Sequence, residues 1–140
     1  MNAAMNRYDN VFGSARSSRS RNQLEQLLSE PADAVDGLPF GAIQLSADGV
    51  ILGYNRYESA LSGRSQKSAL GKNFFTQVAP CTNVKEFAGR FHAGVKAGRL
   101  HTVFRFLFNF RKPAWVTITL YLHKGTATAW VLVRREDEQP

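Results

Sequence analysis

The chain has 140 residues, which is the length of one ordinary domain and leaves too little for two. Apolar residues make up 44% of it and charged residues 21%, so the composition is that of a globular protein and excludes disorder of the whole chain. No apolar stretch approaches the ~20 residues of a membrane span, and with Cys81 as its one cysteine the chain forms no internal disulfide and no cysteine-based zinc site. We expect a cytoplasmic protein without a membrane partner.

The formal net charge is +7. Basic residues gather in residues 1–22 and again in residues 85–112, where Glu86 is the one acidic residue. Charge of this sign would suit a nucleic-acid partner, but the basic runs are interrupted and carry no nucleic-acid recognition motif. A solvated basic surface is the preferred interpretation, and a steep dependence of binding on salt concentration would be the sign of nucleic-acid binding instead.

Residues 1–36 are predicted to form an N-terminal tail and cap, and residues 37–140 a single folded domain. Residues 1–22 are rich in Ser, Arg and Asn and lack periodicity, which predicts a mobile tail. In residues 23–29, three leucines fall on one helical face. A helix this short persists only if it docks on the rest of the protein.

The folded domain begins with the pattern of a β-hairpin. Residues 40–45 and 50–54 are mostly apolar, and Asp48 and Gly49 between them predict a tight turn of the primed type, in which glycine accepts a positive φ. Glycines interrupt residues 55–75, which predicts several short helical turns in place of one long helix.

One longer helix is predicted after residue 83. Asn83 has the position of an N-cap residue, with Glu86 three residues later as its reciprocal partner. The apolar face that follows consists of Val84, Phe87, Ala88, Phe91 and Val95. Gly98 stands where a helix-ending glycine belongs.

The last third of the chain is predicted to be strand. Apolar and polar residues alternate in residues 104–110 and again in residues 116–123, and residues 129–133 form a final apolar run after a turn at Gly125. Two strands, short helices, one longer helix and three strands together make an α+β protein, with an antiparallel sheet and its helices gathered on one side.

Signatures of catalysis are missing from the sequence. It has no glycine-rich phosphate loop, no GxSxG, no HExxH and no paired metal-ligand spacing. His92, His101 and His123 fall in different predicted elements, where each is expected to be a surface or interface residue. A small enzyme with Cys81 as its nucleophile would need a histidine spaced to act as the base, and none has that spacing. We therefore do not expect an enzyme.

Cys81 allows two interpretations. It follows Pro80 directly before the predicted long helix, whose dipole would favour a thiolate at this place. A free cysteine is also commonly a small buried apolar residue. The position of the residue in the sequence leaves both interpretations open.

Tyr54 and Glu58 are four residues apart, at the end of a predicted strand and in the helical turn that follows. In such a turn both side chains would project to one face. A phenol and a protonated carboxyl can both donate hydrogen bonds, and burial would keep the carboxyl protonated by raising its pKa. On spacing alone, Glu58 is more simply interpreted as a solvated residue near Arg56.

Six stretches of the chain stand out as a set: residues 37–45, 48–55, 62–64, 71–75, 78–82 and 130–133. Together they resemble the photoactive yellow protein family, the blue-light receptors that form one branch of the PAS domains. The resemblance covers residues 37–135 in the family's order and with nearly its spacing, which makes it far more specific than any one motif. It implies a PAS-like fold, in which a five-stranded antiparallel sheet has helices mainly on one face and an N-terminal cap segment.

In that family a cysteine carries p-coumaric acid (4-hydroxycinnamic acid) as a thioester, and the resemblance implies that Cys81 is the attachment site. Tyr54 and Glu58 match the two residues that donate hydrogen bonds to the phenolate of the chromophore. Ser62 stands where a hydroxyl residue supports the tyrosine, and Arg64 matches the arginine that covers the pocket.

The function implied by the resemblance is blue-light reception. Light would isomerise the chromophore from trans to cis, Glu58 would give a proton to the phenolate, and the N-terminal region would open as the signal. The physical reason for opening would be a buried carboxylate left without a partner. The implied partner is a downstream signalling protein, and the receptor itself is expected to be a monomer or a weak dimer.

One departure from the family pattern bears on this function. The loop at residues 110–115 is one residue shorter than in the family and lacks the methionine that helps dark recovery, which predicts slow recovery here. The alternative function is a PAS-type interaction module that has lost light sensing. The presence of Tyr54, Glu58 and Cys81 together argues against such a loss.

Overall fold

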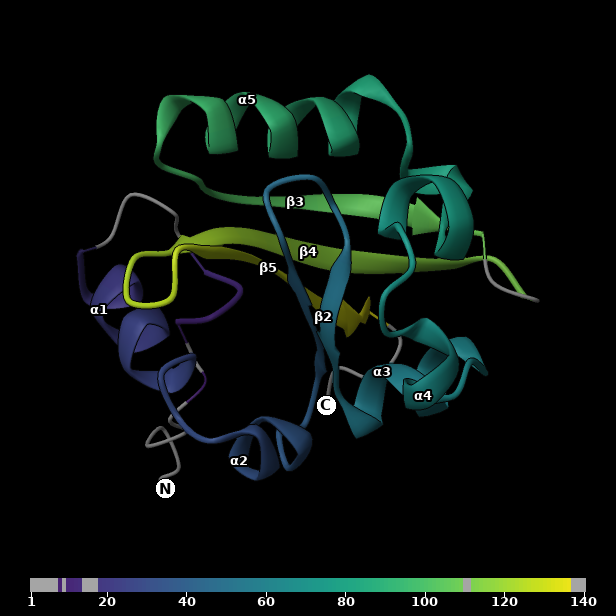
Figure 1. Cartoon of the computed structure of the whole chain (residues 1–140), viewed down its shortest axis with the longest axis horizontal. Helices are drawn as coiled ribbons and strands as arrows, with labels where there is room; N and C mark the ends of the chain where they lie inside the picture. Colours follow the sequence, from purple (N-terminus) through teal and green to yellow (C-terminus); the bar gives the residue numbers. More distant parts are fainter. Residues whose placement is uncertain (1–7, 9, 14–17, 110–111, 137–140) are drawn as a thin grey trace.

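The structure, a computed structural model, describes residues 8, 10–13, 18–109 and 112–136 of the chain. Five strands form one antiparallel sheet in the order β2-β1-β5-β4-β3 (Figure 1). The strands are β1 (Gly41–Leu45), β2 (Ile51–Tyr54), β3 (His101–Phe108), β4 (Ala114–His123) and β5 (Thr128–Arg135). The predicted succession along the chain, with two strands, then helices, then three strands, and the α+β class are confirmed.

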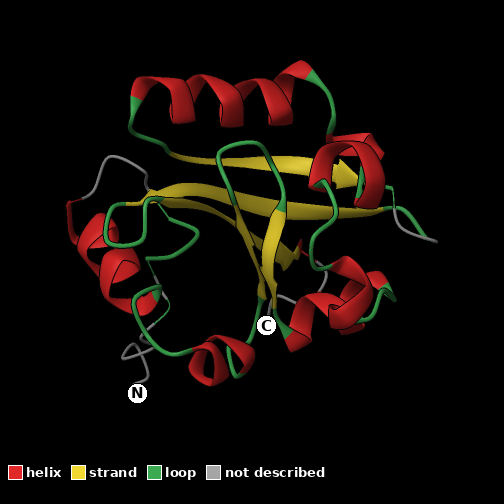
Figure 2. Cartoon of the chain, viewed as in Figure 1, coloured by secondary structure: helices red, strands yellow, loops and turns green. Residues whose placement is uncertain are grey.

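Short helices surround this sheet (Figure 2). The α-helices are α1 (Ser18–Leu27), α2 (Ala32–Asp36), α3 (Arg56–Ser62), α4 (Gln66–Ala69) and α5 (Arg90–Ala97). Between α4 and α5 the chain forms two π-helical segments, η1 (Phe74–Val78) and η3 (Lys85–Gly89), and a 3₁₀ turn, η2 (Pro80–Thr82). The prediction of several short helical turns after residue 55 is confirmed. None of the helices in the described ranges is long and apolar enough to cross a membrane.

Each face of the sheet has its own apolar core, because alternate strand residues point to opposite faces. On one face, Val116, Ile118 and Leu120 of β4 pack with phenylalanines of η1, η3 and α5. On the other face, Trp130 and Leu132 of β5 pack with the N-terminal segment that contains α1 and α2. Helices α3 to α5 therefore cover one face, as predicted, and the N-terminal cap covers the other.

The N-terminal cap reaches further toward the start of the chain than predicted. Helix α1 begins at Ser18, and Val11 and Phe12 are buried, with the ring of Phe12 at 5.2 Å from that of Phe40 between centroids. The prediction that residues 1–22 form a mobile tail is wrong for the described part of that segment, and its other residues lie outside the described ranges. Val11 and Phe12 are a single apolar pair in a polar segment and show no periodicity. The sequence pattern therefore does not predict that this segment packs on the sheet.

The predicted hairpin of β1 and β2 is present, but its turn has another form. Gly49 has a φ of +88°, as expected, whereas Asp48 does not have a positive φ. The amide of Gly49 donates to the carbonyl of Ser46, and the amide of Ser46 donates to the carbonyl of Val50. The connection is a three-residue loop that ends with glycine in the left-handed region, and the predicted primed turn is wrong.

The start of the long helix also differs from the prediction. The chain enters it through Val84 and the π-helical segment η3, with no side-chain cap at Val84, so the capping box of Asn83 and Glu86 is wrong. Asn83 instead ends η2 with φ −81° and ψ 60°, so the backbone turns before the helix begins. The predicted end of the helix at Gly98, which has a φ of +78°, is confirmed.

Candidate functional site

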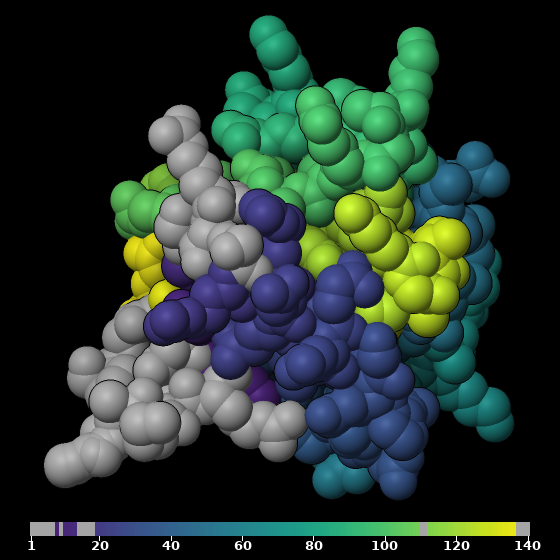
Figure 3. Space-filling model, turned by 90° about the vertical axis from the view of Figure 1, so that its left-hand side faces the viewer, coloured from purple at the N-terminus to yellow at the C-terminus, as the bar shows by residue number. Residues whose placement is uncertain are grey.

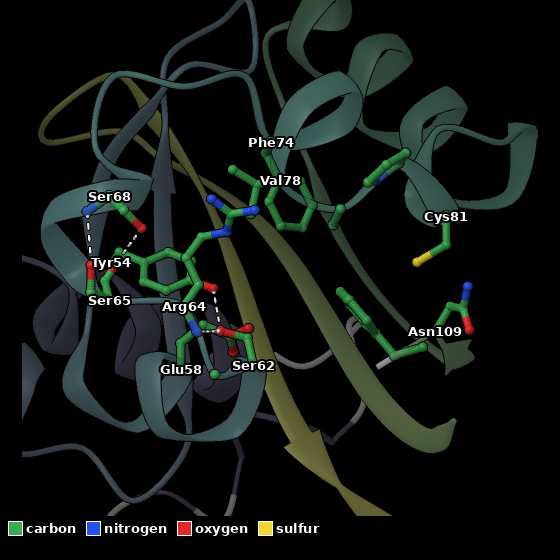
Figure 4. A pocket seen from close by; sticks show the side chains of 14 residues that line it. Tyr54, Glu58, Ser62, Arg64, Ser65, Ser68, Phe74, Val78, Cys81 and Asn109 are labelled. Atoms are coloured by element: carbon green, nitrogen blue, oxygen red, sulfur yellow. Dashed lines mark hydrogen bonds between the residues drawn. The ribbon is translucent and has the colours of Figure 1, made fainter. Parts of the chain in front are cut away.

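A cavity of about 780 Å³ lies where α3, η1, η2 and the end of β3 meet. Tyr54, at the end of β2, lines one end of it together with Glu58 and Ser62 of α3 (Figure 4). Arg64 follows α3, and Cys81 lies in η2 on the opposite side. The structure therefore brings all five predicted site residues to one cavity.

Asn55 sets the geometry of the Tyr54 and Glu58 pair. Its side-chain oxygen accepts hydrogen bonds from the amide of Glu58 at 3.0 Å and from the amide of Ala42 in β1 at 2.9 Å. The strand thus ends at Tyr54 and the helix starts directly after Asn55, so that side chains four residues apart both reach the cavity. The sequence prediction missed Asn55, although its spacing from Glu58 is that of a capping box.

The hydroxyl of Tyr54 forms a hydrogen bond of 2.7 Å with the hydroxyl of Ser62. Burial raises the pKa of Tyr54 above its ordinary value, and the neighbouring carboxyl of Glu58 raises this pKa further. The phenol therefore keeps its proton at neutral pH, and Ser62 holds its hydroxyl in place. Tyr54 can present this O–H group to a ligand in the cavity.

Glu58 is a buried carboxyl with an unsatisfied oxygen. The residue is 1% exposed, and its Oε1 atom has no hydrogen-bond partner within the described ranges. Burial raises the pKa of Glu58 to about 8, so the group is mostly protonated at neutral pH. The interpretation of Glu58 as a solvated residue near Arg56 is wrong. A buried polar atom without a partner costs free energy. Oε1 lies against Gly41 of β1, and the carboxyl as a whole borders this end of the cavity.

Gly41 of β1 makes room for the Glu58 carboxyl, because a Cβ atom at this position would collide with Oε1 of Glu58. We predict that Gly41→Ala displaces the carboxyl and lowers the free energy of unfolding by about 1–3 kcal/mol, the usual cost of overpacking. Urea unfolding would measure the loss. Gly53→Ala in β2 is the matched control, because its Cβ would approach only the flexible Gln44 side chain, at 3.3 Å. An equal loss in the two variants would contradict the prediction.

Arg64 lies between the two ends of the cavity. Its amide donates to the Ser62 hydroxyl at 3.2 Å, and its carbonyl accepts from the Ser59 hydroxyl at 2.7 Å, so its backbone is held to α3. The guanidinium extends toward Phe74 and Val78 (Figure 4). Its positive charge opposes the rise in the pKa of the Tyr54 hydroxyl. Arg64 can therefore interact with negative charge that develops near this hydroxyl.

Cys81 lies half-buried at the other end of the cavity. Its turn is held by the hydroxyl of Thr82, which donates to the carbonyl of Ala79 at 2.7 Å. The segment η3 continues directly into α5, so Cys81 lies in the turn shortly before this long helix, as predicted. The interpretation of Cys81 as a fully buried apolar residue is wrong. Its sulfur is available for covalent chemistry from the cavity.

Apolar side chains form the walls between the two ends. Phe74 and Val78 come from η1, and Phe108 comes from the end of β3. The result is a cavity with a thiol at one end and two O–H donors, from Tyr54 and Glu58, at the other. Within the described ranges, no group of three His, Cys, Asp or Glu residues could hold a metal ion. The cavity suits a small aromatic acid that is linked to the thiol and carries an oxygen at its far end.

Known proteins share both the sequence and the fold. The PAS fold family matches residues 29–135. The photoactive yellow protein of Rhodothalassium salexigens is 39% identical to this chain, over 82% of this chain and 94% of its own length. That of Halochromatium salexigens is 41% identical, over 81% of this chain and 93% of its own length. The solved photoactive yellow protein domain of the sensor histidine kinase Ppr from Rhodospirillum centenum is 44% identical, with a TM-score of 0.74 over 78% of this chain and 96% of that domain. The chain therefore belongs to the photoactive yellow protein family of PAS-fold proteins.

Proposed function

We propose that this chain is a blue-light photoreceptor that binds p-coumaric acid as a thioester on Cys81. The observation that supports this most strongly is the single cavity lined by Tyr54, Glu58 and Cys81. The Tyr54 hydroxyl and the buried carboxyl of Glu58 border the end opposite the Cys81 thiol. Membership of the photoactive yellow protein family supports the same function.

p-Coumaric acid fits these residues in chemistry. When bound, it supplies the absorption of light, a double bond that isomerises and a phenolic oxygen that can carry negative charge. The Cys81 sulfur provides the covalent link, and the walls formed by Phe74 and Val78 suit an aromatic ring. Tyr54 and protonated Glu58 provide two O–H donors for an oxygen at the far end.

Tyr54 and Glu58 are suited to stabilise negative charge in a buried place. A buried anion is costly unless it is hydrogen-bonded, and hydrogen bonds to an anion are short and strong. Burial raises the pKa of both residues, so both hold a proton at neutral pH and both can donate. Ser62 positions the Tyr54 hydroxyl, and the Arg64 guanidinium adds a positive charge near it.

Glu58 is also the residue that can start a structural response. If it gives up its proton inside the cavity, its carboxylate stays buried, and Oε1 has no partner within the described ranges. A buried charge without a partner is strongly destabilising. Helix α3 is linked through the Asn55 amide group to the carbonyls of Val35 and Phe40 in the N-terminal region. Loosening at Glu58 would therefore reach the N-terminal cap, and opening of this cap is the proposed signal.

The test is an absorption spectrum of the purified chain after it is mixed with activated p-coumaric acid, with Cys81→Ala as the matched control. The expected result is a blue band that bleaches in light, returns in darkness and is absent from the control. Circular dichroism checks that both proteins are folded. A folded wild-type chain without such a band would refute the proposal and favour a PAS interaction module without light sensing.

We predict that recovery in the dark is slow. The loop at residues 110–115 contains no methionine, whereas many members of the family carry one there that helps recovery. Residues 110 and 111 lie outside the described ranges, so this prediction depends on the sequence. The measurement is the return of the blue band after a flash, beside a relative that carries the methionine. Equal recovery times would contradict the prediction.

A downstream signalling protein is the proposed partner. The similar domain from Rhodospirillum centenum belongs to a sensor histidine kinase, which supports a role in signalling for this chain as well. The released N-terminal cap and the sheet face beneath it are the surfaces that such a partner would contact. In this proposal the chain is a cytoplasmic receptor, a monomer or a weak dimer, and performs no catalytic turnover.

A further inference from the structure

Part of the basic charge of the chain surrounds a second cavity. This cavity has a volume of about 470 Å³ and shares no lining residue with the first. Arg21 comes from α1, Arg99 from the link between α5 and β3, and Lys124 from the turn after β4. The surfaces of these three segments meet on the face of the molecule seen in Figure 3.

These three cations are not neutralised within the described ranges. The side chains of Arg21, Arg99 and Lys124 are exposed, and none of them forms an ion pair with a described carboxylate. Long exposed side chains can move onto a ligand without breaking existing contacts. The cavity therefore offers three positive groups from three separate elements.

The nearby carboxylate of Glu25 is engaged elsewhere. Its Oε2 atom accepts hydrogen bonds from the Tyr121 hydroxyl at 2.5 Å and from the Lys124 amide at 2.9 Å. Its Oε1 atom lies 3.5 Å from Nε2 of His123. Glu25 thus links α1 to β4, and its oxygens do not pair with the charged ends of Arg21, Arg99 or Lys124.

His101 is a further part of the cavity wall. Neither of its ring nitrogens has a hydrogen-bond partner within the described ranges, and its ring packs edge-on against Tyr121 at 5.3 Å between centroids. Burial lowers the pKa of His101, and the charge of Arg21 lowers it further. Burial, with the charge of Arg21 as a smaller cause, therefore favours the neutral ring, and an anion in the cavity would offset the charge of Arg21.

We propose that this cavity binds a small molecule carrying a phosphate group, and that the bound anion links α1 to the sheet. The guanidinium groups of Arg21 and Arg99 present planar N–H donors that match phosphate oxygens, and the Lys124 ammonium adds a third charge. Three cations suit a ligand with two or more negative charges better than a single carboxylate. Because Arg21 belongs to the cap and the other two cations to the body of the domain, one anion can contact both.

The test is calorimetric titration of the full chain with pyrophosphate, at an ionic strength held constant with sodium chloride because salt screens exposed charges. Saturable binding is expected, and Arg99→Gln and Lys124→Gln are each expected to weaken it by about tenfold, the effect of one charge-assisted hydrogen bond. Lys96→Gln is the matched control, since this exposed residue of α5 does not line the cavity. No saturable binding, or equal weakening by all three substitutions, would overturn the proposal.

Two further measurements separate this site from a general basic surface. The first is the affinity of the chain for duplex DNA. Binding of DNA that is tighter than binding of pyrophosphate, and that Arg99→Gln and Lys96→Gln weaken equally, would overturn the proposal in favour of nucleic-acid binding. Pyrophosphate is expected to slow hydrogen exchange of the α1 amides in the wild-type chain and to leave it unchanged in Arg21→Gln. Unchanged exchange of α1 in the wild type would overturn the link between cap and sheet.

Discussion

The chain without a chromophore is expected to lose about 3–5 kcal/mol of its free energy of unfolding between pH 4.5 and pH 8 because of Glu58 alone. Burial raises the pKa of Glu58 to about 8 in the folded protein, from an ordinary value of 4.5. Between these two values the folded state holds a proton that the unfolded state has released. Each pH unit in this interval therefore lowers stability by about 1.4 kcal/mol.

The direction of this effect follows from the raised pKa. The contribution of the protonated Glu58 to stability is complete below pH 4.5, where Glu58 is protonated in both the folded and the unfolded state. This contribution is lost as the pH rises through about 8. His101 has the opposite effect on stability. Burial lowers its pKa, so in acid the unfolded state binds a proton that the folded state does not bind, and stability rises with pH. The difference between the wild-type chain and Glu58→Gln isolates the carboxyl from such groups.

Urea unfolding at pH 5 and at pH 8 measures this difference. The free energy of unfolding of the wild-type chain should fall by several kcal/mol more than that of Glu58→Gln. Tyr54→Phe is the matched control, because it removes the neighbouring hydroxyl and leaves the buried carboxyl. Wild-type and Glu58→Gln stabilities that change in parallel would show that Glu58 is ionised in the folded chain, and Glu58 could then not act as a donor in the cavity.

The strands could be predicted from the sequence, but some of the connections could not. A two-residue period places the apolar side chains of residues 116–120 on one face, and this local pattern is sufficient to predict a strand. The turn between β1 and β2 depends on a distant contact, in which the Asn73 side chain donates to the carbonyl of Asp48 at 3.0 Å and Val50 pairs with Asn73. Local turn rules contain no information about such a contact, so the predicted turn type was wrong.

The site required more than local pattern. The four-residue spacing predicts that Tyr54 and Glu58 share a face, but the burial of Glu58 depends on the missing side chain of Gly41 in β1. That Cys81 lines the same cavity depends on how η1 and η2 pack, and no spacing rule predicts this. Family resemblance brought these residues together because it carries information on the whole fold. It did not identify Asn55, whose importance follows from its contacts.

Asn55→Ala is expected to lower the free energy of unfolding by about 3–4 kcal/mol. Asn55 is 2% exposed, and its side chain accepts from the amides of Ala42 and Glu58 and donates to the carbonyls of Val35 and Phe40, at 2.9 to 3.0 Å. Alanine would remove four hydrogen bonds, each worth about 1 kcal/mol net, and would leave buried backbone groups without partners. Urea unfolding of the wild-type chain and the variant measures the loss.

Asn73→Ala is the matched control for this substitution. Asn73 also caps a helical segment, by accepting from the amides of Phe75 and Thr76, but it does so from a more exposed place. Its replacement is expected to cost about 1–2 kcal/mol, the usual value for an N-cap together with the loss of the exposed hydrogen bond to the carbonyl of Asp48. Equal losses of unfolding free energy in the two variants would contradict the prediction that the buried contacts of Asn55 stabilise the fold more than an ordinary helix cap does.

Hydrogen exchange can locate the effect of Asn55→Ala within the fold. Asn55 joins the helix that carries Glu58 to both β1 and the end of α2, so its loss should increase exchange in α2 much more than in α5. Equal increases in α2 and α5 would mean that the variant only destabilises the whole domain. A selective increase in α2 would mean that a change at Glu58 has a direct path to the N-terminal cap, which is what a receptor that signals by opening this cap requires.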